Sequence, residues 1–138
     1  GYARAFLVSL FDFRYLETKI DGEGLNQTSK PFLLLISNTN LLGYNISILP
    51  NASIFDGKLD LIVVEKMSWL KIFLFFIMTV FRYYPKINKV KRSKIYYVTL
   101  HSQDKNFIYQ IDGDFVDKKT NKLVVSVLQK GLSVIVPC

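Results

Sequence analysis

Short strand-like segments separated by turn residues dominate this chain and restrict the folds that it can adopt. Apolar or β-branched runs that predict strands lie at residues 13–20, 32–36, 44–49, 59–64, 95–100, 107–111, 123–128 and 132–136. The continuous apolar run at 32–36 predicts a central strand. Because most of these segments follow one another without a helical crossover, we expect a mainly β domain built as an antiparallel sandwich or barrel.

Two segments have helical spacing instead. Residues 2–11 fit the end of a longer helix, and residues 68–84 predict an internal helix with Ser68 as its N-cap and Pro85 as its stop. The apolar face predicted for the internal helix comprises Trp69, Ile72, Phe73, Phe76, Ile77 and Val80. The expected fold class is therefore an antiparallel β-sandwich-like domain with one inserted apolar helix and an N-terminal helix.

Length and cysteine content indicate a single domain. The 138 residues suffice for one hydrophobic core, and Cys138 has no second cysteine with which to form an internal disulfide. No run reaches the roughly 18 consecutive apolar residues of a membrane-spanning helix. The chain starts at Gly1 and enters an apolar pattern at once, so we expect it to be a piece of a longer protein whose remainder lies upstream.

The net charge of +7 predicts an anionic partner such as nucleic acid, a phospholipid surface or a phosphorylated small molecule. A basic cluster follows the internal helix and consists of Lys86, Lys89, Lys91, Arg92 and Lys94. This cluster is either a solvated connection or, together with the apolar helix, an interfacial element that touches anionic lipid. Aromatic residues are not interleaved with the basic ones as on surfaces that stack bases, so nucleic acid is the less favoured partner.

Two acid–glycine signals stand beside strand-like segments. Asp56 precedes Gly57, where a sharp turn brings backbone carbonyls near a carboxylate, the mixture of oxygens that Mg²⁺ and Ca²⁺ prefer. An ordinary Asp-Gly turn explains the same pattern. A similar signal at residues 21–24 leads into polar residues 26–30, which have the composition of a loop, and we treat it as the weaker candidate.

The second signal is Asp112, Gly113 and Asp114. Acids at positions i and i+2 of an extended chain project from the same face, so the pair could share a proton or a metal, or one member could act as a general base. The alternative is a hairpin turn, because Asp-Gly is also the commonest short-hairpin signal. The residues alone leave both interpretations open.

The order of these motifs resembles a known family. From about residue 31 onward the chain is similar to the C-terminal domain of the diacylglycerol kinase catalytic family, which includes bacterial diacylglycerol kinases, related soluble lipid kinases and the sphingosine kinases. The residues that carry the resemblance are Asn38, Gly43, Ile48, Pro50, Asn51, Ala52, Asp56, Gly57, Leu59, Asp60, Leu61, Asp112, Gly113, Asp114 and the closing run 134–137.

The resemblance implies a two-domain enzyme that transfers the γ-phosphate of ATP to a lipid hydroxyl, as in diacylglycerol or sphingosine. Residues 1–138 would form the C-terminal β-sandwich domain on the lipid side of the cleft. ATP would be bound mainly by an N-terminal nucleotide-binding domain that carries a Gly-Gly-Asp-Gly-Thr loop and is absent from this chain. The isolated chain would then be inactive.

The resemblance also implies roles for particular residues. Asp56 matches the aspartate that binds a structural Mg²⁺ in bacterial members, and the backbone carbonyls of Ser53 and Lys58 match its other ligands. Asp114 matches the acid that accepts the proton of the lipid hydroxyl, and Asp112 stands beside it. Asp114 is one methylene shorter than the glutamate usual in the family.

Partners and location follow as further expectations. We expect a lipid substrate at a membrane surface, the nucleotide-binding domain of the same full-length protein, no nucleic acid, and a cytoplasmic protein peripheral to the membrane. A homodimer stays open. The alternative function is a non-catalytic basic β-domain that binds an anionic membrane or nucleic acid, and a missing upstream nucleotide loop would favour it.

Overall fold

The computed structural model describes residues 15–40, 47–84, 86–103 and 106–131. The predicted N-terminal helix at 2–11 and the predicted strand at 132–136 lie outside these ranges. Half of the strand predicted at 44–49, residues 44–46, also lies outside them, and residues 47–49 are buried without being part of a strand.

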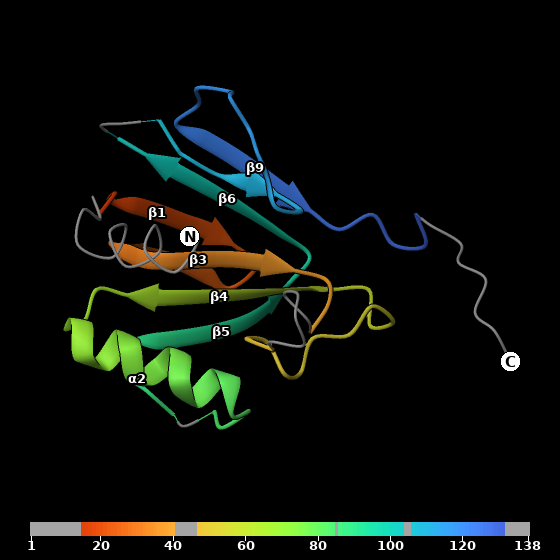
Figure 1. Cartoon of the computed structure of the whole chain (residues 1–138). Helices are drawn as coiled ribbons and strands as arrows, with labels where there is room; N and C mark the ends of the chain where they lie inside the picture. Colours follow the sequence, from red (N-terminus) through yellow and green to blue (C-terminus); the bar gives the residue numbers. More distant parts are fainter. Residues whose placement is uncertain (1–14, 41–46, 85, 104–105, 132–138) are drawn as a thin grey trace, which may run out of the picture.

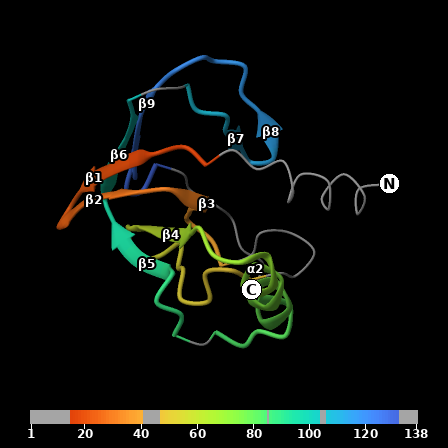
Figure 2. The same cartoon turned by 90° about the vertical axis from the view of Figure 1, so that its left-hand side faces the viewer.

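Two antiparallel sheets are stacked, and one helix covers the outer face of the smaller sheet (Figures 1 and 2). The larger sheet has the order β2-β1-β6-β9, with β1 at Thr18–Gly22, β2 at Leu25–Ser29, β6 at Tyr97–Ser102 and β9 at Lys122–Ser126. The smaller sheet has the order β3-β4-β5, with β3 at Pro31–Ser37, β4 at Leu59–Glu65 and β5 at Val90–Ile95. The short strands β7 at Gln110–Ile111 and β8 at Asp114–Phe115 form a separate hairpin, and α2 spans Trp69–Val80. The predicted mainly β, sandwich-like class with one inserted helix is confirmed.

Strand β4 contributes to two hydrophobic cores. Its residues Leu59, Leu61 and Val63 point into the core between the sheets, where they meet Ile20, Ile95, Val98 and Leu100. Ile62 and Val64 point to the opposite side, into the core beneath α2, with Phe32, Ile48, Leu49, Ile72 and Phe75. Successive side chains of a strand alternate between its faces, so a run that is apolar throughout requires cover on both sides.

The prediction that residues 32–36 form a central strand is wrong. In the described sheet β3 lies at the edge and pairs with β4, while β4 holds the centre between β3 and β5. The apolar run reflects layers on both faces of β3, because Leu34 and Ile36 pack against the first core and Leu33 and Leu35 against the second. Apolarity reports which faces are covered and gives no information on the order of strands in the sheet.

Two segments assigned to connections are strands. Residues 25–29, with loop composition, form β2, an edge strand that alternates half-buried and exposed side chains and pairs with β1. The basic segment at Val90–Ile95 is β5, which pairs with β4 over its whole length. Polar and basic residues are compatible with these positions because both strands lie at an edge of their described sheet and leave one flank open to solvent.

Helix α2 begins after Ser68, as predicted, but ends at Val80, before Tyr84 and Pro85. Arg82 adopts a left-handed conformation with φ 55°, and its N–H donates to the Thr79 carbonyl while the N–H of Tyr83 donates to the Met78 carbonyl. These two bonds form a Schellman motif, which stops the helix without help from the proline. No helix in the described part of the chain is long and apolar enough to cross a membrane.

The buried side of α2 includes only part of the predicted apolar face, of which Ile72 is buried and Phe76 is partly buried against the second core. Ile72, Phe75 and Thr79 are buried, and the buried hydroxyl of Thr79 donates a hydrogen bond to the Phe75 carbonyl at 2.8 Å. Trp69 is 70% exposed and Phe73 is 53% exposed. The helix is apolar on nearly all sides, so its sequence could not reveal which side packs on the sheet.

Candidate functional site

Asp56 lies in a turn within residues 51–58, directly before the start of β4. The Asp56 carboxylate accepts the N–H of Lys58 through Oδ1 at 3.0 Å, and Gly57 has φ 68°, a conformation that suits glycine. The hydroxyl of Ser53 accepts the N–H of Phe55 at 3.2 Å. The predicted Asp-Gly turn is therefore present, and it is closed by short side-chain bonds to the backbone.

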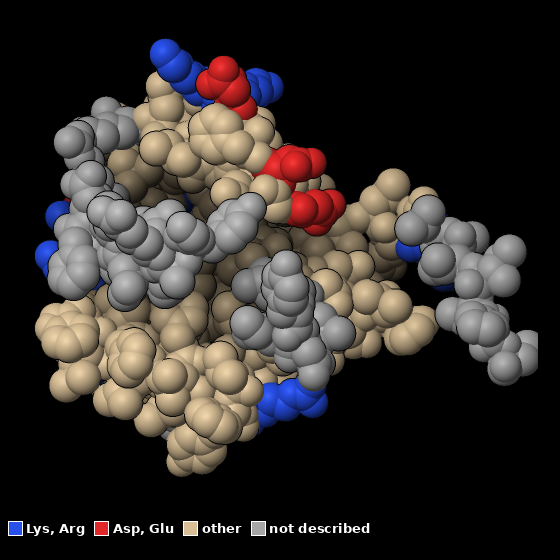
Figure 3. Space-filling view, in the orientation of Figure 1, with Lys and Arg blue, Asp and Glu red and all other residues tan. Residues whose placement is uncertain are grey.

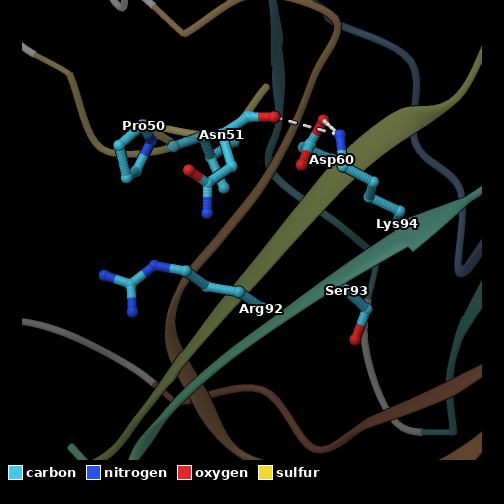
Figure 4. Close-up of a pocket in the computed structure, with 7 residues that line it drawn as sticks. Pro50, Asn51, Asp60, Arg92, Ser93 and Lys94 are labelled. Atoms are coloured by element: carbon cyan, nitrogen blue, oxygen red, sulfur yellow. Dashed lines mark hydrogen bonds and ion pairs between the residues drawn. The ribbon is translucent and has the colours of Figure 1, made fainter. Parts of the chain in front are cut away.

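Lys94 lies at the centre of this region. In the β4–β5 ladder it stands opposite Asp60, and its Nζ donates to Asp60 Oδ2 at 3.1 Å. The same Nζ donates to Asp56 Oδ2 at 2.6 Å and to the Asn51 carbonyl at 3.0 Å. Figure 4 shows Lys94 directed at Asp60 and the Asn51 carbonyl, while Arg92 extends away from it. One ammonium therefore joins the turn to both strands.

These contacts shift the titration of the two most exposed partners. The hydrogen bond from Lys94, and after it the one from the Lys58 N–H, holds the pKa of the Asp56 carboxyl below its usual value. The hydrogen bond to Asp56, with a smaller contribution from Asp60, raises the pKa of the Lys94 ammonium. Both shifts favour the charged forms, so the cluster remains an ion pair near neutral pH.

A cavity of about 170 Å³ opens beside Lys94. It is lined by Leu49, Pro50, Asn51, Asp60, Arg92, Ser93 and Lys94. Arg92 lies with its guanidinium 6.0 Å from the centre of the Tyr84 ring, and partial burial lowers its pKa. Tyr84 is in turn fixed by its hydroxyl, which donates to the Ser47 carbonyl at 2.8 Å. The lining of the cavity therefore comes from β4 and β5 and from the chain before the Asp56 turn.

Asp112 and Gly113 form the turn of the β7–β8 hairpin. Asp112 has φ 51° and Gly113 has φ 94°, while Ile111 pairs with Asp114 on either side. Two left-handed central residues characterise a type I′ hairpin turn. The same-face geometry expected for positions i and i+2 of an extended chain is therefore wrong, and the hairpin interpretation is confirmed. Both carboxylates are exposed to solvent.

The structure does not bring the two acid–glycine motifs together. The β7–β8 hairpin lies on the β6–β9 side of the molecule, whereas the chain before β4 lies beside β4 and β5 (Figures 1 and 2). Among the described residues, no three or more His, Cys, Asp or Glu side chains come together as a group that could hold a metal ion. A Mg²⁺ ion held by Asp56 with the carbonyls of Ser53 and Lys58 stays a prediction.

The basic cluster is divided by strand β5. Lys89 and Lys91 form ion pairs with Glu65 at 3.4 and 2.8 Å, and Lys94 binds the Asp56 turn. Of the basic cluster in the sequence, only Arg92 and Lys86 form no ion pair within the described ranges. A single solvated basic connection is therefore not what these residues form.

An exposed apolar surface covers the outer side of α2 and the residue after it. We call it the α2 surface, and it consists of Trp69, Leu70, Phe73, Leu74, Ile77, Val80 and Phe81. Figure 3 shows it as an uninterrupted tan region at the lower left, over α2. Exposed apolar side chains that lie next to one another are typical of surfaces that contact a membrane or another molecule.

Sequence reasoning missed the pairing of Lys94 with Asp56 and Asp60. Asp56 is a candidate in the sequence, but Asp60 stands there only among the residues of the family resemblance and Lys94 only in the basic cluster. The available signal was the alternation of side chains along β5, which places Lys94 on the same face as Arg92 and Val90. In the β4–β5 pairing this is also the face of Asp60, the direct partner of Lys94. That register becomes visible only once residues 90–95 are recognised as a strand.

Comparison with known proteins identifies the fold. The family model described as "YegS C-terminal NAD kinase beta sandwich-like domain" matches residues 1–136. A crystal structure of a proposed diacylglycerol kinase from Bacillus anthracis str. Sterne superimposes with a TM-score of 0.69 at 20% identity, covering 94% of this chain and 45% of that one. A second structure with that description, from the same organism, has a TM-score of 0.68 at 20% identity, with coverages of 90% and 41%.

A third structure, of a diacylglycerol kinase from the same organism, has a TM-score of 0.62 at 19% identity, with coverages of 86% and 40%. At these identities the likeness establishes the fold. The chain spans less than half the length of each of these solved structures. A search among curated proteins gave no match.

Proposed function

Because the chain belongs to the family of the YegS C-terminal NAD kinase beta sandwich-like domain, we propose that it forms the lipid-side domain of an ATP-dependent lipid kinase. The observation that carries this proposal is the family match over residues 1–136, together with a fold shared with structures described as diacylglycerol kinases. The proposed reaction transfers the γ-phosphate of ATP to a lipid hydroxyl and releases ADP.

Asp114 is the proposed proton acceptor. As the lipid hydroxyl oxygen attacks the γ-phosphorus, its proton passes to the Asp114 carboxylate and the bond to ADP breaks. The exposed position of this residue next to the hairpin turn supports the role, because a hydroxyl on another molecule can approach it. Asp112, in the turn itself, contributes a second negative charge close by and is proposed to help orient the acceptor.

The other half of the reaction belongs to a nucleotide-binding domain. ATP and the Mg²⁺ that accompanies its phosphates are proposed to bind mainly there, since phosphoryl transfer relies on positioning and on neutralisation of phosphate charge. The described residues of this chain supply acids at the hairpin turn, and they contribute no cluster of three or more acidic, His or Cys side chains for a metal. The proposed cleft therefore lies between the two domains.

The α2 surface is proposed to contact the membrane that holds the lipid substrate. Lys71 on the helix and Lys86 after it form no ion pair within the described residues, and no acid lies between Lys66 and Lys86. An apolar helix with basic neighbours binds a bilayer through burial of its side chains and attraction to anionic lipids. This arrangement favours a peripheral membrane position for the domain.

Activity of the full-length protein tests the proposal. We expect transfer of labelled phosphate from ATP to at least one of diacylglycerol, sphingosine and phosphatidylglycerol. Binding to anionic vesicles without transfer to any lipid in a broad panel would favour the alternative, a non-catalytic domain that binds membranes. The exposed apolar α2 surface is the observation that keeps this alternative in place.

A further inference from the structure

Three oxygens of the kind that ligate metal ions surround the ammonium of Lys94. They are Asp56 Oδ2, the Asn51 carbonyl oxygen and Asp60 Oδ2, at 2.6, 3.0 and 3.1 Å from Nζ. We infer that Lys94 is the resident cation of the Asp56 turn and that its ammonium holds the turn without a divalent metal. This inference concerns the chain's own stability and metal requirement, and it does not depend on the proposed kinase activity.

Asp60 explains why a cation is needed here. Asp60 is only 6% exposed and lies at the start of β4, where a buried carboxylate without a partner would lower the stability of the fold. Asp56 brings a second carboxylate to the same ammonium, so the two acids would repel each other if nothing positive lay between them. Lys94 reaches both because the β4–β5 register places it directly opposite Asp60.

A metal ion at Asp56 would have to share the carboxylate with Lys94. One oxygen of Asp56 accepts the Lys58 N–H and the other accepts Lys94, so neither is free of hydrogen bonds. The ammonium of Lys58 does not substitute for Lys94, because it lies over the Tyr96 ring, 4.9 Å from its centre. A divalent ion at the point where Nζ lies would therefore have to displace the Lys94 ammonium.

The position is nevertheless suitable for a cation other than an ammonium. Ca²⁺ binds oxygens at about 2.3–2.6 Å and tolerates irregular geometry, and the three oxygens around Nζ need to close in by only about half an ångström. Removing the ammonium while keeping the oxygens should convert the turn into a metal site. This conversion provides the test.

Thermal unfolding of the full chain, with EDTA or with excess Mg²⁺ or Ca²⁺, makes the comparison. The wild-type Tm should be the same in all three conditions. Lys94→Met should lower the Tm in EDTA, and Mg²⁺ or Ca²⁺ should restore part of the loss, with a shift of several degrees, because a ligand that binds only the folded state stabilises it. Lys91→Met is the matched control, because Lys91 lies on β5 like Lys94 but pairs with Glu65 of β4. Its Tm should not rise when metal is added.

Calorimetric titration of Mg²⁺ into the wild-type chain keeps the inference testable if Lys94→Met does not fold. No uptake that depends on Asp56 is expected. The inference is overturned if wild type binds Mg²⁺ in a way that Asp56→Asn abolishes, or if EDTA lowers the wild-type Tm while Lys94→Met is insensitive to metal. A Tm for Lys94→Met equal to that of wild type in EDTA would also overturn it.

Discussion

The ammonium of Lys94 lies 2.6 Å from the carboxylate of Asp56, although 38 positions separate the two residues in the sequence. This contact ties a turn to the far edge of a sheet and gives a motif associated with metal binding a cation of its own. It also separates the two acid–glycine motifs by environment, because Asp56 is engaged by the chain while Asp112 and Asp114 face solvent.

Asp114→Asn in the full-length protein should lower kcat on the order of 10²–10⁴-fold, because the amide cannot accept the hydroxyl proton. Asp114→Glu should retain activity, since the carboxylate is kept. Phosphate transfer from labelled ATP measures both, and circular dichroism checks folding. Asp117→Asn, an exposed acid in the connection after β8, serves as the control. Near-normal turnover in Asp114→Asn would remove this residue from the role.

Replacing Trp69 and Phe73 by serine should weaken binding to anionic vesicles at least tenfold. Both side chains are exposed, and burial of each in a bilayer should contribute about 1.5 kcal/mol or more to the free energy of binding. Vesicle sedimentation with mixed phosphatidylglycerol and phosphatidylcholine measures the change. Val124→Ser on β9, an exposed apolar residue outside the α2 surface, is the matched control and should bind like wild type. Equal binding by all three proteins would exclude the α2 surface as the contact.

Acidification should remove the stabilising contribution of Glu65. The hydrogen bond from Lys91, assisted by Lys89, lowers the pKa of Glu65 below its ordinary value of 4.5. A depressed folded-state pKa means that the contribution is complete above the unfolded pKa and is lost as the pH falls through the lower, folded value. Because both lysines are about half exposed, we expect only about 0.5–1 kcal/mol.

Urea unfolding of wild type and Glu65→Gln as a function of pH tests this expectation. The difference in unfolding free energy between the two proteins should be largest near neutral pH and should shrink below about pH 4.5. A difference that stays constant across this range would show that the ion pairs of Glu65 do not contribute through its charge.

Gly57→Ala should destabilise the domain more than Gly24→Ala does. The two glycines have similar left-handed φ values, 68° and 72°, so a side chain pays a similar backbone cost of about 1–2 kcal/mol at either position. A Cβ at Gly57 would also lie 3.0 Å from the side chain of Gln129, whereas nothing lies within 4 Å at Gly24. Chemical denaturation of both variants measures the difference in unfolding free energy. Equal decreases would mean that the Gln129 side chain moves aside without loss of stability.

Much of the fold was accessible from the sequence because the signals were local. The apolar run of β4 and the turn residues around Gly57 follow directly from residue types and periodicity. Strand β5 was missed because half of the residues in Val90–Ile95 are basic, and only pairing with β4 makes a strand of them. Strand propensity depends on neighbours that the sequence does not show.

The candidate site was accessible only in part, for a related reason. The sequence offers two interpretations of Asp112 and Asp114, and the choice depends on whether the flanking residues pair across Gly113. The contact of Lys94 with Asp56 depends on a register between strands that α2 separates in the chain. The buried side of α2 was unpredictable because the helix presents apolar residues in almost every direction, and packing alone selects Phe75 over Phe73.

Strand β4 has a further consequence for how the domain comes apart. Its side chains belong to both cores, and its backbone is hydrogen-bonded to a neighbour on each side. Loss of either core exposes half of the same strand, so the helix layer and the sheet pair should open as one cooperative unit. The amide protons of Ile62 and Val63 should then exchange with solvent only through global unfolding, whereas those of the self-paired β7–β8 hairpin should exchange through local opening.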